Sequence, residues 1–93
     1  MDFHDGIEIL NDNSTPMKFV VSVLESHVGL KRSEAIRTML RIHERGGVLL
    51  PVSTASEATR IAEAISAKAA KKNYLLVCRA ASLAPSNPRL ERP

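Results

Sequence analysis

The chain has 93 residues, a formal net charge of +3 and a single cysteine. This length builds one small domain, and its core must be aliphatic because there is no Trp, one Tyr and two Phe. Basic residues are spread along the chain without Gly-interrupted basic loops, which argues against nucleic-acid binding. No stretch approaches the roughly 20 apolar residues of a membrane span, and the N-terminus shows no apolar h-region of a signal peptide. A cytoplasmic monomer that contacts no membrane is expected.

The N-terminal part predicts a strand followed by a helix. Residues 6–10 alternate and then run apolar, which is typical of a short strand. Thr15 and Pro16 form a strong helix-start signal, with Thr15 as the N-cap and Pro16 as the first helical residue. Apolar residues at helical spacing continue this helix to a stop at Gly29. These positions are Phe19, Val20, Val23, Leu24 and Val28.

The rest of the chain predicts two more helices and two more strands. A helix is expected over residues 32–44, ended by Gly46 and Gly47, and a strand over residues 48–52 in which Pro51 indicates a sheet edge. A complete capping box at residues 54–57 starts the third helix, and residues 74–78 read as a buried final strand.

The predicted fold class is therefore α/β (α+β), a small single domain in the order β-α-α-β-α-β, with a short sheet packed against three helices. Residues 1–6 are expected to form a short flexible arm. Residues 7–81 are the core domain. The Pro-rich residues 82–93 are expected to be a disordered tail.

Polar and apolar side chains are predicted to meet where the first strand ends. The oxygens of Asn11, Asp12 and Asn13 would gather there as acceptors for a cationic donor such as an ammonium group. Met17 and Val20 offer apolar surface just inside. The second helix presents two further apolar side chains and an imidazole toward the same region, namely Met39, Ile42 and His43. From the pattern alone, these apolar residues could equally be ordinary core.

Enzymatic sites are not supported by the sequence. There is no Gly-rich phosphate loop, and no cysteine lies at ligand spacing from the histidines, so neither a cofactor nor a metal is expected. A triad could be drawn from Ser14, His43 and Asp12, but Ser14 lacks the sharp strand-to-helix turn that an activated serine needs.

Four segments together resemble one known family, the ClpS adaptors. They are Asn-Asp-Asn-Ser-Thr-Pro-Met at residues 11–17, Phe-Val at 19–20, Met-Leu-Arg-Ile-His at 39–43 and Leu-Val-Cys at 76–78. The family pattern is N-D-D-x-T-P-M, F-V, M-L-x-V-H and an LLC-like strand, and the match runs from about Ile7 to Cys78 without an internal gap.

The resemblance implies a non-enzymatic adaptor of the N-end rule. Such an adaptor binds substrates that begin with Leu, Phe, Tyr or Trp and delivers them to an AAA+ unfoldase of the ClpA or ClpC type for degradation by ClpP. It implies that Asn11, Asn13 and His43, with Asp12 nearby, hold the substrate's α-ammonium group. The implied side-chain pocket comprises Thr15, Met17, Val20, Met39, Ile42 and Leu76.

Two departures from the family pattern bear on this function. Asn13 stands where Asp is usual, which removes a negative charge from the ammonium site, and Ile42 stands where Val is common. The alternatives are a ClpS-like regulator with weak or narrowed binding of N-terminal residues, and a ribosomal-stalk-like protein interaction module.

Overall fold

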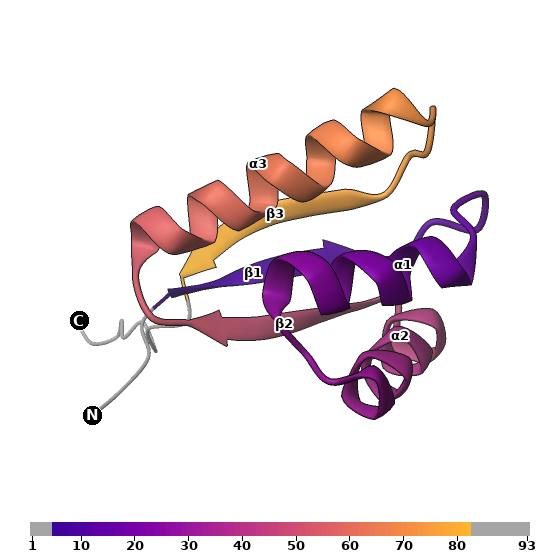
Figure 1. Ribbon diagram of the computed structural model, residues 1–93, viewed down its shortest axis with the longest axis horizontal. Coiled ribbons are helices and arrows are strands. Elements are labelled where there is room, and N and C mark those ends of the chain that lie inside the picture. Colours follow the sequence, from indigo (N-terminus) through magenta and orange to yellow (C-terminus); the bar gives the residue numbers. More distant parts are fainter. Residues whose placement is uncertain (1–4, 83–93) are drawn as a thin grey trace, which may run out of the picture.

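Three antiparallel strands form a sheet in the order β2-β1-β3 in the computed structural model, which describes residues 5–82 (Figure 1). The elements are β1 (Asp5–Leu10), α1 (Met17–Val23), the π-helical turn η1 (Leu24–Val28), α2 (Arg32–Arg45), β2 (Gly47–Val52), α3 (Ala55–Lys71) and β3 (Val77–Ser82). The predicted architecture and element order are confirmed. Of the expected arm and tail, Asp5, Gly6 and Ser82 lie in strands, and the remaining residues are outside the described range.

The side chains of the central strand β1 alternate between a buried and an exposed face of the sheet. Ile7 and Ile9 are fully buried, and Ile9 pairs with Val48 on one side and Cys78 on the other. Glu8 belongs to the opposite face, where its carboxylate accepts a hydrogen bond from Arg79 Nε at 2.8 Å. This alternation fixes the register, because a slip of one residue would bring Glu8 into the core.

The helices supply the rest of the core. α3 packs on β1 and β3, α2 packs on β2, and α1 packs on α2 (Figure 1). The apolar stripe predicted for α3 is buried, and it consists of Ala58, Ile61, Ala62, Ile65 and Ala69. The Phe19 ring meets the edge of the Tyr74 ring at a centroid distance of 4.9 Å, which ties α1 to the segment before β3.

Several predicted boundaries are confirmed by backbone geometry. Gly29 ends η1 with φ of 87° and Gly46 ends α2 with φ of 89°, a left-handed conformation that glycine adopts without steric cost. Thr54 caps α3 by accepting the Glu57 amide at 3.0 Å. Pro51 lies in β2, which is an edge strand. No helix within residues 5–82 is long and apolar enough to cross a membrane.

The predicted boundaries of two elements are wrong. Thr15 does not cap the first helix, because Pro16 is the N-cap and the helix begins at Met17. The Thr15 hydroxyl instead donates to the Asp12 carboxylate, a charge-assisted bond that is stronger than one from a backbone amide. The last strand runs from Val77 to Ser82 rather than over residues 74–78, since its register is set by pairing with the six residues of β1. Only Cys78 of the six residues of β3 is buried, so the prediction of a buried strand is also wrong.

Candidate functional site: a cavity at the end of the central strand

The polar segment after β1 is held against the end of α2. The Asn11 amide donates to the carbonyl oxygen of Gly46 at 2.9 Å, so the first residue beyond the strand lies next to the last turn of α2. His43 belongs to that same turn. Side chains that are about thirty residues apart in sequence are thereby brought to one place.

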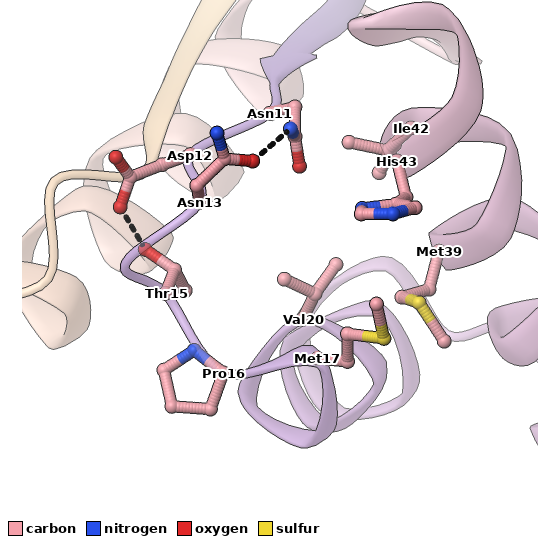
Figure 2. Close-up of a pocket in the computed structure, with 10 residues that line it drawn as sticks. All are labelled: Asn11, Asp12, Asn13, Thr15, Pro16, Met17, Val20, Met39, Ile42 and His43. Atoms are coloured by element: carbon pink, nitrogen blue, oxygen red, sulfur yellow. Dashed lines mark hydrogen bonds between the residues drawn. The ribbon is translucent and has the colours of Figure 1, made fainter.

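Asp12 organises the turn that follows. Its carboxylate accepts the hydroxyl groups of Ser14 at 2.6 Å and Thr15 at 2.7 Å, and the Thr15 amide closes the turn by donating to the Asp12 carbonyl at 3.1 Å. Hydrogen bonds hold the pKa of the Asp12 carboxyl below its ordinary value. The Ser14 hydroxyl contributes most, followed by the Thr15 hydroxyl and then the Leu75 amide. Asp12 therefore stays ionised at neutral pH. Figure 2 shows its carboxylate turned to Thr15, on the side away from His43.

Between this turn, α1 and α2 lies a cavity of about 220 Å³ (Figure 2). Its lining residues are Asn11, Asp12, Asn13, Thr15, Pro16, Met17, Val20, Met39, Ile42 and His43. An apolar cavity of about 150 Å³ in another protein is large enough to take up benzene, so this one has room for a single Leu or aromatic side chain.

The cavity has an apolar floor and an accessible mouth. Val20, Met39 and Ile42 are only 6%, 9% and 2% exposed, so they form the floor. Met17 is 47% exposed and His43 is also exposed, so both stand at the opening. Val20, Met39 and Ile42 therefore belong to the hydrophobic core and at the same time line the cavity, whereas Met17 is exposed beside it.

Acceptors lie at one side of the mouth. Asn11 Nδ2 donates to Asn13 Oδ1 at 3.1 Å, which orients both amides. Asn11 Oδ1 makes no side-chain hydrogen bond within residues 5–82, and it points into the cavity in Figure 2. An amide oxygen has two lone pairs, so Asn13 Oδ1 also retains acceptor capacity. A cationic donor entering here would meet oxygens and an imidazole above an apolar floor.

The structure brings together all the predicted site residues except one. Leu76 does not line the cavity and is 6% exposed within the hydrophobic core. Pro16 does line the cavity, although the sequence analysis assigned it only to the start of the helix. The signal that could have found it is its place between Thr15 and Met17, two residues assigned to the pocket. Among residues 5–82, no cluster of three or more His, Cys, Asp or Glu side chains could hold a metal ion.

Comparison with known proteins places this chain in a class of protease adaptors. A family model described as the ATP-dependent Clp protease adaptor protein ClpS matches residues 7–79. The ClpS of Aromatoleum aromaticum is 36% identical over 70 residues, which cover 75% of this chain and 69% of that protein. The ClpS of Caulobacter sp. strain K31 is 41% identical over 71 residues, covering 75% of this chain and 64% of that protein.

The fold itself matches a solved structure, Agrobacterium tumefaciens ClpS2 bound to L-phenylalaninamide. The TM-score is 0.80 at 21% sequence identity, and the match covers 88% of this chain and 99% of that one. The chain belongs to the ClpS family of Clp protease adaptors.

Proposed function

We propose that this protein binds the first residue of substrates that begin with Leu, Phe, Tyr or Trp and delivers them to a ClpA- or ClpC-type AAA+ unfoldase coupled to ClpP. The observation that carries the proposal is the cavity, whose apolar floor of Val20, Met39 and Ile42 lies below the acceptors Asn11 and His43. The ligand bound to ClpS2, L-phenylalaninamide, combines a free amino group with an aromatic side chain and so supports the same chemistry.

The energetics are sufficient for reversible capture. Burying a Leu side chain contributes about 1.5–3 kcal/mol. Each hydrogen bond from an ammonium group adds roughly 1.5–3 kcal/mol. After the cost of association, micromolar binding near about −8 kcal/mol is reasonable.

Discrimination follows from the same contacts. A Leu within a chain offers a peptide N–H in place of the ammonium group, so it loses the charge-assisted bonds at Asn11, Asn13 and His43. An N-terminal Lys would bury part of its charged side chain against an apolar floor, which is costly without a partner.

Asn13 favours a second candidate, a ClpS-like regulator with weak or narrowed binding. Its side chain is a neutral amide already engaged by Asn11, so it attracts an ammonium group less than a carboxylate would. The family match favours both of these functions over a ribosomal-stalk-like module.

Titration with matched peptides tests the proposal. Peptides that start with Leu, Phe, Tyr or Trp should bind, and the same peptides with an acetylated N-terminus should not. His43→Ala should weaken binding about tenfold, the loss of one charge-assisted hydrogen bond. Arg41→Ala is the matched control, because Arg41 is exposed on the same helix and does not line the cavity. Equal binding of free and acetylated peptides would contradict the proposal.

Delivery needs a separate reconstitution. Addition of the protein to a ClpA- or ClpC-type unfoldase with ClpP should accelerate degradation of a reporter that begins with Leu. A reporter that begins with Lys should be degraded at an unchanged rate. Binding without any acceleration would instead support the regulator.

A further inference from the structure

A second and larger depression adjoins the cavity. It occupies about 570 Å³ between α2 and the α1–η1 segment, and Val21 and Ile36 contribute to its apolar floor. Ile36 is 38% exposed, an uncommon degree for an isoleucine on an amphipathic helix. We call this depression the α1–α2 groove.

The groove borders the cavity. Met17 and Met39 line both spaces, so these two methionine side chains lie at their common boundary. Figure 2 shows these side chains at the side of the cavity away from Asn11. Methionine is unbranched and polarizable, and it adapts readily to neighbouring apolar groups.

This arrangement sets the path of a bound peptide. An ammonium group at Asn11 would occupy one side of the mouth, so the chain beyond the first residue would leave on the other side, over Met17. In an extended chain, side chains two residues apart point to the same side and lie about 7 Å apart. The side chain of the third residue would therefore enter the groove when the first enters the cavity.

The charges at the groove favour some sequences over others. Arg32 Nη1 lies 3.2 Å from the Glu25 carboxylate, so these two charges compensate each other. Lys18 also lines the groove, is exposed, and forms no ion pair within residues 5–82. A basic side chain on the same peptide segment would be repelled by it.

We infer that the α1–α2 groove is a second subsite for the substrate, which takes an apolar side chain at the third position and disfavours a basic side chain there. The inference rests on the proposed function, because the register is set by the first residue in the cavity. It extends recognition from a single residue to the first few residues of the substrate.

The test compares peptides that start with Leu and differ only at the third residue, Leu or Ser. The third-position Leu should raise affinity about fivefold, less than full burial gives because the groove is open. Ile36→Gln should abolish this gain and leave the third-position Ser peptide unaffected. Leu40→Gln should retain the gain, since Leu40 is similarly exposed at 43% on the same helix but lines neither space.

A second pair of peptides tests the charge. Lys in place of Ser at the third position should weaken binding about threefold at low salt, as expected for exposed charges. Lys18→Glu should remove this penalty. Lys68→Glu changes the net charge equally on α3, outside the groove, and should leave the penalty in place.

The outcomes separate the subsite from the function on which it rests. If free but not acetylated peptides bind and the third residue has no effect, or Ile36→Gln and Leu40→Gln behave alike, the subsite is overturned and the proposed function stands. A penalty for third-position Lys that is absent or insensitive to Lys18→Glu overturns the charge preference. If binding does not depend on the free amino group at all, both proposals are overturned.

Discussion

Asn13→Asp tests the electrostatics of the mouth most sharply. Asp has nearly the same shape as Asn, and its carboxylate can still accept the Asn11 amide that Asn13 Oδ1 accepts at 3.1 Å. The substitution therefore adds one negative charge and leaves the geometry of the mouth in place. We expect tighter binding of peptides with a free amino group.

The magnitude is limited by solvent. Asn13 is exposed, so an ion pair between its replacement and the substrate ammonium is screened by water. Exposed ion pairs contribute up to about 1 kcal/mol, which corresponds to a gain of about fivefold in Kd at low salt. The gain should shrink as salt is added.

Isothermal titration of a Leu-starting peptide measures this effect. Asn73→Asp is the matched control, since Asn73 is exposed in the turn after α3 and does not line the cavity. It makes the same change in net charge and should leave the affinity nearly unchanged. If the Asn13→Asp variant binds the Leu-starting peptide no more tightly than the wild type does, the assigned role of this position is refuted.

Three further substitutions or conditions have defined outcomes. Ile42→Val should enlarge the cavity by one methyl group and raise the affinity for Trp-starting over Leu-starting peptides about threefold, at a cost of about 1 kcal/mol in stability. Competition binding and thermal melts measure both, and an unchanged ratio would show that the extra methyl group of Ile42 does not limit the size of the bound side chain. His43→Gln should retain more peptide affinity than His43→Ala, because its amide oxygen can still accept from an ammonium group; equal losses in the two variants, measured by peptide titration, would remove the acceptor role of His43 from the site. Burial raises the pKa of the Cys78 thiol from 9.0 to about 11, so the thiolate should be about a hundredfold scarcer near pH 8 and alkylation slow until the chain unfolds. Since the raised pKa belongs to the folded state, its contribution to stability is complete below about pH 9 and is lost as pH rises toward about 11; rapid alkylation of the folded protein would refute this burial.

Local signals in the sequence were sufficient to predict most of the fold. Left-handed glycines end helices at Gly29 and Gly46, and the Thr54 cap starts α3, because each of these depends on only a few neighbouring residues. Most residues of the site could also be predicted from the sequence, since the polar residues after β1 and the helical spacing of Met39 and His43 are both local patterns.

The misplaced features depend on contacts that are distant in sequence. The start of β3 is set by the pairing of Val77 with Leu10. The apolar residues before Val77 therefore did not mark the start of the strand, and one of them, Leu75, is 71% exposed. The Thr15 hydroxyl donates to the Asp12 carboxylate, and it does not accept from the first amides of the helix, which the sequence analysis had expected. The π-helical turn η1 leaves the apolar spacing nearly unchanged, so periodicity could not distinguish it from an α-helix.

The most direct test of the central claim is a crystal structure of the protein with a Leu-starting peptide. The account predicts the Leu side chain within the cavity, in contact with Val20, Met39 and Ile42, and the ammonium group within hydrogen-bond distance of Asn11 and His43. A peptide bound elsewhere on the surface, or bound in the cavity through an internal residue, would contradict it.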